Sequence, residues 1–186
     1  LTELVNDVVT RCPTKTIMLK NLEQVEKLIA LARSLLTLTK VTGDRPPLQL
    51  APLELEPLLQ ELIIELKLLA DDRRISLALD VVPVPTISAD AQWLKQALIN
   101  LLDNSLKYTP PGGSVTVRLR RSDGSLEIAV RDTGPGIEAE HVPFLFDRFY
   151  RADKARARES GGTGLGLAIV KGIVEAHGGT VSVDTQ

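Results

Sequence analysis

Apolar residues recur with a helical period over the first forty positions. The first set is spaced i, i+3, i+4, i+7, i+8 before the interruption at Cys12-Pro13-Thr14: Leu1, Leu4, Val5, Val8 and Val9. A second set alternates spacings of four and three: Met18, Leu22, Val25, Ile29, Ala32, Leu36 and Thr39. Such an a/d seam faces a partner helix in coiled coils and four-helix bundles. We therefore predict a helical hairpin over 1–42 and a homodimer through residues 1–40 that completes a four-helix bundle. The alternative is that the hairpin packs on its own globular domain.

A second unit follows the linker at 43–47, which contains glycine and two prolines. Over 48–186 the hydrophobic periods predict these elements in order: a short strand followed by a leucine-faced helix within 48–72, an alternating strand at 75–81, a helix capped by Asp90, a hairpin at 114–132 turning at Asp123-Gly124, a helix at 164–176 and a final strand starting in 178–183. This order indicates an α+β fold whose antiparallel or mixed sheet carries helices on one face.

Composition narrows the classes of function. The chain has 44% apolar but only 3% aromatic residues, so its core is aliphatic, and the net charge of −2 argues against a nucleic-acid partner. One cysteine excludes an internal disulfide, and the two separate histidines give no metal-site spacing with it. No uncharged apolar run approaches the ~20 residues of a membrane span. We expect a cytoplasmic chain without membrane contact, whether or not membrane segments lie upstream in a longer sensor.

Four polar residues interrupt the leucine-faced helix that follows Asp90. Asn100, Asn104, Lys107 and Tyr108 fall within roughly 100° of arc, on a different side from the leucines. Asn104 can supply a carbonyl oxygen to a hard cation such as Mg²⁺. Lys107 and Tyr108 can donate hydrogen bonds to phosphates. The alternative interpretation is an ordinary solvated stripe.

Two glycine motifs complete this chemistry. In "DTGPGI" (132–137), Asp132 can accept from the exocyclic amine of a base, while Gly134 and Gly136 avoid a Cβ clash, although the stretch also reads as a plain turn. In "GGTGLGLAIV" (161–170), glycines precede an apolar helix whose free N–H groups favour phosphate. The second motif follows no strand and lacks G-K-[ST], which argues against Rossmann and P-loop sites.

These motifs and their order along the chain resemble those of the sensor histidine kinases of two-component systems, whose ATP-binding fold is shared with Hsp90, DNA gyrase and MutL. "NLLDNSLKYTPPGG" resembles the N box, "DTGPGI" and "GGTGLGLAIV" the two glycine boxes, and "FDRFYRADKA" the F box, within a match over 48–183. The resemblance implies a two-layer α/β sandwich that holds ATP under a lid at about 150–163.

The resemblance also implies roles for individual residues. Asn104 would bind Mg²⁺, with Asn100 beside the metal, and Arg148 or Arg151 would steady the transferring phosphoryl group. The expected nucleotide-binding residues are Asn104, Lys107, Tyr108, Asp132, Gly134, Gly136, Gly162, Thr163, Gly164, Leu165 and Gly166. The ATP-hydrolysing relatives have Glu at the position of Asn100. Because an amide cannot act as a general base, phosphoryl transfer is favoured over hydrolysis.

The implied function is an ATP-dependent protein-histidine kinase. It would pass the γ-phosphoryl to a histidine on the dimerisation helix, for relay to an aspartate of a response-regulator receiver domain. The family's His-Glu-x-x-x-Pro motif is absent from this chain, and we do not expect His141 or His177 to replace its histidine. This chain alone should therefore bind ATP without autophosphorylating. The alternatives are a degenerate nucleotide-binding module that dimerises and docks a partner, and an ATPase clamp of the gyrase or Hsp90 type.

Overall fold

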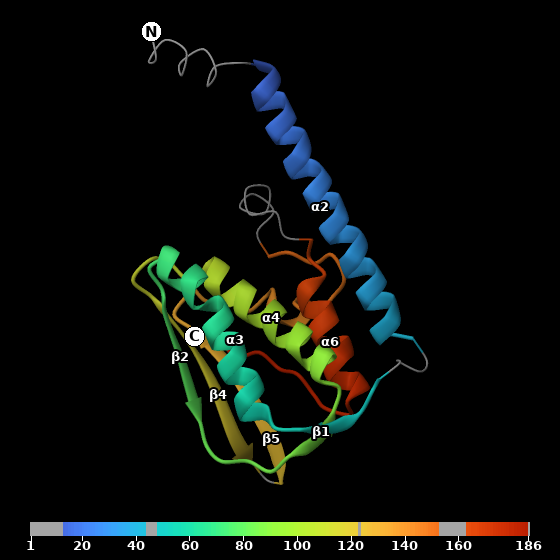
Figure 1. Ribbon diagram of the computed structural model, residues 1–186, viewed down its shortest axis with the longest axis vertical. Coiled ribbons are helices and arrows are strands. Elements are labelled where there is room, and N and C mark those ends of the chain that lie inside the picture. Colours follow the sequence, from blue (N-terminus) through green and yellow to red (C-terminus); the bar gives the residue numbers. More distant parts are fainter. Residues whose placement is uncertain (1–12, 44–47, 123, 153–162, 186) are drawn as a thin grey trace.

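A computed structural model describes residues 13–43, 48–122, 124–152 and 163–185. Helix α2 (Pro13–Val41) projects from the α+β part of the molecule (Figure 1). Pro13 starts this helix, because the N–H that proline lacks would have no partner at the first helical position. The predicted interruption at Cys12-Pro13-Thr14 is therefore wrong for its last two residues, which are helical. Cys12 and the predicted first arm of the hairpin lie outside the described residues.

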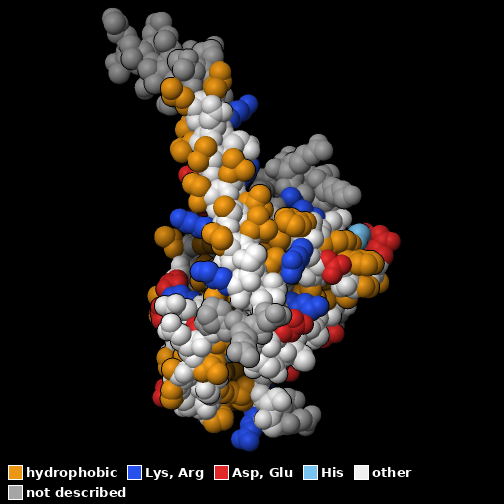
Figure 2. Space-filling view, turned by 90° about the vertical axis from the view of Figure 1, so that its right-hand side faces the viewer, with side chains coloured by type: hydrophobic (Ala, Val, Ile, Leu, Met, Phe, Trp, Pro, Cys, Tyr) orange, Lys and Arg blue, Asp and Glu red, His pale blue; other side chains and the backbone are white. Residues whose placement is uncertain are grey.

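The surface of α2 changes along its length. The seam residues Met18, Leu22, Val25, Ile29 and Leu36 are 46–66% exposed, and hydrophobic side chains run along the projecting helix (Figure 2). Near the end of the helix, Leu38 and Val41 are instead buried against α6 (Gly166–Ala176). The alternative that this region packs on its own domain thus holds only for the end of α2, and dimerisation through the seam stays a prediction.

The strands form one mixed sheet and one small antiparallel pair. The order in the larger sheet is β2 (Ser76–Val81), β4 (Ser114–Ser122) and β5 (Ser125–Asp132), with β2 parallel and β5 antiparallel to β4. Because parallel strands need a crossover, the chain passes through β3 and α4 between β2 and β4. The pair consists of β1 (Ala51–Leu53) and β3 (Ile87–Ala89).

Helices α3 (Leu55–Asp72) and α4 (Ala91–Tyr108) lie over one face of the larger sheet (Figure 1). Their apolar stripes meet the inward side chains of the strands in one buried aliphatic core: Leu55, Leu58, Leu59, Leu62, Ala70, Ile75, Leu77, Leu98, Leu102, Leu106, Val115, Val117 and Leu119. Helix α6 packs against α4 and forms a second core with the end of α2. The predicted two-layer α+β sandwich is confirmed.

Two other predictions meet different outcomes. The final strand predicted to start in 178–183 is absent, because residues 180–185 run without strand pairing. The Thr185 hydroxyl of this segment accepts a hydrogen bond from Ile137 N at 2.8 Å, which is a side-chain contact and not part of a backbone ladder. The domain boundary at 43–47 stays a prediction, since 44–47 are not described. The structure also has a short 3₁₀ turn, η1 (Val142–Phe144). Within the described residues, no helix is long and apolar enough to cross a bilayer.

Candidate functional site

The candidate site is built along the second half of α4. Helix α4 runs antiparallel to α6, so Gly166 at the start of α6 lies beside Asn100, and His177 at its end lies beside Asp90. The end of β5 reaches α4 at Ser105. Segments that are far apart in the sequence thus meet on one helix.

Asp132 projects from the end of β5 and is exposed. Its Oδ2 accepts a hydrogen bond from the Ser105 hydroxyl at 3.1 Å, and its Oδ1 accepts from Gly134 N at 2.9 Å. These two donors hold the carboxylate in one orientation while its outer side stays open to solvent. Sequence analysis missed Ser105; its place one residue after Asn104, on the inner side of the helix, was the available signal.

The chain passes close to the end of α4 at Gly134, where a side chain would not fit. A Cβ on Gly134 would lie 2.8 Å from Asp132 Oδ1 and 3.4 Å from the carbonyl oxygen of Tyr108. The turn therefore approaches the end of α4 closely enough to exclude any larger residue without rearrangement. Gly136, two residues later, has φ +75°, a left-handed conformation that favours glycine.

The glycine-rich segment before α6 is shaped by close contact with residue 149. Gly164 has φ +70°, and a Cβ there would lie 2.8–3.0 Å from backbone atoms of Phe149, whose N donates to Gly164 O at 2.9 Å. Leu165 is fully buried, and its N donates to the Thr163 hydroxyl at 3.4 Å. Gly162 lies outside the described residues. The described glycines thus leave the start of α6 facing α4 near Asn100.

Asn100 and Asn104 lie one helical turn apart on α4 and are both partly buried. The Nδ2 atom of Asn100 is buried and has no hydrogen-bond partner among the described residues. Buried polar atoms are nearly always paired in native proteins, so an orphan of this kind indicates a ligand, a water or strain. The Oδ1 atom of the same side chain lies 3.7 Å from the position of a Cβ on Gly166.

Positive charge gathers at the end of α4. Burial is the main cause that lowers the pKa of Lys107, and repulsion from Arg151 and Arg73 lowers it further, against the attraction of Asp103. The ammonium also lies 5.3 Å from the ring centroid of Tyr108. A cation in this environment gains when an anion binds beside it.

Arg148 is directed to a different element. Its Nη2 donates to the hydroxyl of Thr42, just beyond the end of α2, at 3.3 Å. Arg151 thus acts on Lys107 while Arg148 contacts the end of α2, so the two arginines that the resemblance offers as alternatives have different surroundings.

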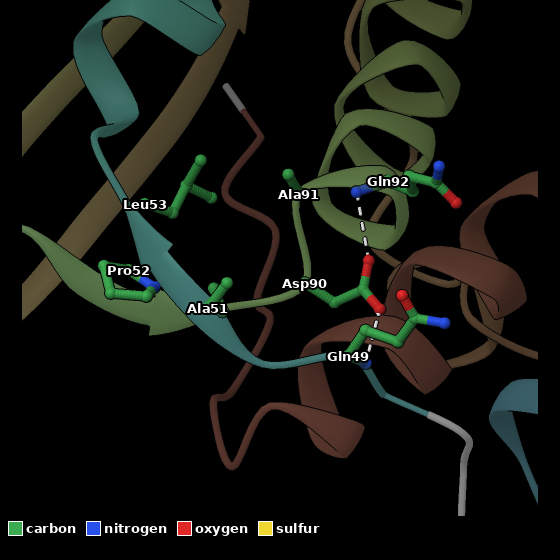
Figure 3. A pocket seen from close by; sticks show the side chains of 8 residues that line it. Gln49, Ala51, Pro52, Leu53, Asp90, Ala91 and Gln92 are labelled. Atoms are coloured by element: carbon green, nitrogen blue, oxygen red, sulfur yellow. Dashed lines mark hydrogen bonds between the residues drawn. The ribbon is translucent and has the colours of Figure 1, made fainter.

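At the opposite end of α4, the polar groups around Asp90 are hydrogen-bonded within the chain. Asp90, predicted as the N-cap, accepts from Gln92 N with Oδ1 and from Gln49 N with Oδ2 (Figure 3). Its Oδ1 also accepts from Trp93 N. Its own N–H donates to His177 Nε2 at 3.0 Å, and His177 Nδ1 lies 2.8 Å from Ile173 O. The ring of His177 thus links the end of α6 to the start of α4.

A pocket of about 180 Å³ lies beside Asp90, lined by β1 and the start of α4 (Figure 3). At 1.5 Å per helical residue, Asp90 and Lys107 are roughly 25 Å apart. This pocket is therefore separate from the candidate site.

The other histidine, His141, lies near two acidic side chains. Glu138, Glu140 and His141 place potential ligand atoms within 4.8 Å of one another, and His141 Nδ1 lies 2.8 Å from the Tyr150 hydroxyl. Histidine and cysteine spacing alone did not predict this cluster. Both glutamates are exposed, and exposed acidic groups are common without a bound ion, so we assign no site here.

Comparisons with known proteins give a consistent picture. Residues 89–186 match the family described as histidine kinase-, DNA gyrase B- and HSP90-like ATPase. The sensor histidine kinase CusS of Escherichia coli O157:H7 is 37% identical over 170 residues, which cover 91% of this chain and 35% of that protein. The sensor-like histidine kinase SenX3 of Mycolicibacterium smegmatis is 34% identical over 167 residues, covering 90% and 44%. The crystal structure of full-length ShkA in complex with AMPPNP has a TM-score of 0.76 at 30% identity, covering 90% of this chain and 35% of that one. This chain thus spans less than half the length of each of these proteins.

Proposed function

The chain belongs to the histidine kinase-, DNA gyrase B- and HSP90-like ATPase family and carries a catalytic domain of the sensor histidine kinase type, and on this premise we propose that it binds Mg-ATP and transfers the γ-phosphoryl to a histidine. The acceptor histidine stands on the dimerisation helix of the whole protein. From there the phosphoryl passes to an aspartate of a response-regulator receiver domain. Because ATP and receiver domains are cytoplasmic, the proposal places the chain in the cytoplasm.

The convergence of three segments on α4 carries the proposal. Ser105 orients Asp132 at 3.1 Å, Gly134 passes the end of the helix, and Gly166 opens α6 beside Asn100. The carboxylate of Asp132 can accept from the amine of the base, and the cations at the end of α4 can meet the phosphates. The N-terminus of α6 favours the negative charge of the nucleotide.

We assign the adenine amine to Asp132 and the phosphates to Lys107, Tyr108 and the start of α6. Binding of phosphate beside Lys107 would relieve the repulsion that Arg151 and Arg73 exert on its ammonium. Gly134 and Gly136 leave room for the adenine ring because they have no side chains, and Gly164 and Gly166 leave room for the phosphates. The hydrogen bond from Leu165 N to the Thr163 hydroxyl holds the turn at Gly164.

The donor groups on α4 fit magnesium and phosphate. The amide oxygen of Asn104 is the kind of ligand that Mg²⁺ prefers, and the unpartnered Nδ2 of Asn100 is a donor suited to a phosphate oxygen. When bound, Mg²⁺ neutralises phosphate charge and leaves the γ-phosphorus more open to attack. Asn104 is the residue of this chain that would hold it.

In the transfer step, an imidazole nitrogen forms a bond to the γ-phosphorus while the bond from phosphorus to the β,γ-bridging oxygen breaks. ADP leaves with that electron pair, and the imidazole releases its proton to a neighbouring base. Arginine and lysine side chains stabilise the charge that develops on the phosphoryl oxygens. Asn100 cannot deprotonate water, which disfavours hydrolysis relative to this transfer.

The exposed seam of α2 supports a second copy of the chain as a partner. Five large apolar side chains of that seam are 46–66% exposed, and a symmetric bundle would bury them. The receiver domain is the second expected partner. No feature of the composition calls for nucleic acid.

Titration of the chain with a fluorescent ATP analogue tests nucleotide binding. We expect saturable binding that requires Mg²⁺ and is lost in Asn104→Ala. Asp132→Asn should weaken binding about 10- to 100-fold, since hydrogen bonds to a charged group contribute roughly 1.5–3 kcal/mol. Glu127→Gln, which changes an exposed carboxylate on the same strand, serves as the matched control.

Radiolabelled ATP then tests transfer. The chain alone should stay unlabelled, while an added hairpin that carries a phosphoacceptor histidine should acquire a label stable to base but not to acid. Binding without transfer to a complete hairpin would support the degenerate docking module instead. Steady hydrolysis abolished by Asn104→Ala would support the ATPase clamp.

A further inference from the structure

The end of α2 is fixed firmly on the α+β domain. Leu38 and Val41 are 3% and 4% exposed and share a core with Ile169 and Ile173 of α6. A Cβ on Gly172 would lie 2.8 Å from Val41 Cγ2, so the absence of a side chain at 172 allows this approach. Close packing of this kind transmits displacement, because protein interiors have few voids. Movement of the last turn of α2 therefore acts directly on its neighbours.

Thr42, the first residue after α2, joins this end to the F-box segment. Its hydroxyl donates to Leu38 O at 2.8 Å, which fixes the side chain on the last helical turn. The oxygen of the same hydroxyl accepts from Arg148 Nη2 at 3.3 Å. The two residues are 106 positions apart in sequence, so the contact exists only in the folded chain.

The backbone beside Arg148 is held from the opposite direction. Phe149 N donates to Gly164 O at 2.9 Å, and Phe149 adopts φ +64°, which is unusual for a bulky residue. Arg148 therefore lies between two elements. Its backbone is next to the glycine turn before α6, and the tip of its side chain reaches the end of α2. Its guanidinium has five N–H donors, so a bond to Thr42 leaves others to face a phosphate.

We propose that Thr42 is a positioning residue for Arg148, through which the end of α2 sets the place of this guanidinium relative to the transferring phosphoryl group. The inference rests on the proposed function, because it takes Arg148 to interact with the γ-phosphate. It also links the helix that carries the exposed seam to the chemistry, since Thr42 shifts whenever the last turn of α2 shifts.

The experiment compares the affinities of the chain for a non-hydrolysable ATP analogue and for ADP, because only the former has a γ-phosphate. Arg148→Ala should lower the preference for the analogue. Thr42→Val, which keeps the shape but removes the hydroxyl, should lower it about threefold, as expected for one hydrogen bond. Thr42→Ser should restore the preference, and Thr42→Val should add little to Arg148→Ala in the double variant.

Ser34→Ala is the matched control. The Ser34 hydroxyl donates to Ala30 O four residues earlier, as Thr42 donates to Leu38 O, so the control loses the same kind of helical back-bond. Its preference should equal that of the unchanged chain. Thermal unfolding of each variant checks that the change in preference is not caused by loss of folded protein.

Three outcomes would overturn the inference while ATP binding, and with it the proposed function, survives. The preference could be the same in Thr42→Val and Ser34→Ala, the effects of Thr42→Val and Arg148→Ala could add fully, or Arg148→Ala could leave the preference unchanged. Failure of the unchanged chain to bind the analogue at all would instead contradict the proposed function.

Discussion

The two ends of α4 differ in how completely their polar groups are paired. At the first end, Asp90 is buried, its carboxylate accepts from three backbone N–H groups, and its own N–H reaches His177. At the other end, Asn100 Nδ2 has no partner among the described residues, Asp132 is exposed, and the pKa of Lys107 is lowered, first by burial. We call these the paired end and the open end.

The difference separates stability from binding along one helix. Groups that are paired within the chain stabilise the fold, whereas buried or crowded polar groups without partners lower stability until a ligand supplies the missing contacts. The open end coincides with the residues that sequence motifs assign to the nucleotide. Substitutions at the two ends should therefore have opposite patterns of effect on unfolding and on ATP affinity.

The largest effect on stability is expected outside α4, in the glycine turn before α6 that faces the open end. Gly164→Ala should lower the free energy of unfolding by about 2–5 kcal/mol, because a Cβ there meets the Phe149 backbone at 2.8 Å and φ is +70°. Gly112→Ala is the matched control, since Gly112 also has positive φ but a Cβ there meets nothing within 4 Å. The control should lose only about 1–2 kcal/mol. Urea unfolding measures both, and equal losses would show that the contact with Phe149 is unimportant.

A smaller effect is expected at the paired end. Asp90→Ala should lower the free energy of unfolding by about 2 kcal/mol, since it removes the N-cap and the contact with Gln49. ATP affinity, measured by titration on the folded variant, should stay within about twofold because Asp90 lies far from the proposed nucleotide-binding residues. A tenfold loss of affinity would mean that the two ends are not separable.

The contribution of Asp90 should also depend on pH. Burial alone would raise its pKa, but the N–H groups of Gln49, Trp93 and Gln92 outweigh burial and lower the pKa overall. A carboxyl with a lowered pKa stabilises the fold above its unfolded pKa of about 4 and loses that contribution as pH falls through the folded value. The stability difference between the unchanged chain and Asp90→Ala should therefore be constant above about pH 5 and shrink below pH 4.

The smallest effect is expected at Lys107. Its lowered pKa means that the charged form is disfavoured in the folded chain, a penalty that is relieved as pH rises towards the unfolded value of about 10.4. Lys107→Gln should thus leave nucleotide-free stability unchanged or higher at pH 7, while ATP affinity falls about threefold and its salt dependence weakens. Lys171→Gln, an exposed lysine of α6, is the control. A variant with lower stability and unchanged affinity would contradict the assignment of Lys107 to the open end.

Much of the open end could be read from local sequence. The polar stripe of α4, the carboxylate at the end of β5 and the glycines before α6 are short-range patterns, and each lies where its period or turn chemistry predicts. Ser105 was missed because a serine on a helix is common and its partner Asp132 is 27 residues away. The final strand was predicted from alternation alone, but a strand forms only when a neighbouring backbone pairs with it.

The amino-acid sequence by itself determined most helices and strands of the sandwich, the Asp90 cap and the set of residues proposed to meet a nucleotide, because these depend on hydrophobic period, caps and turns within a few residues. Only the tertiary structure decided that Gly166 lies beside Asn100, that His177 accepts a hydrogen bond from Asp90, and that Thr42 holds Arg148. Those contacts join positions 66 to 106 residues apart, and they depend on how whole elements pack, which no local pattern records.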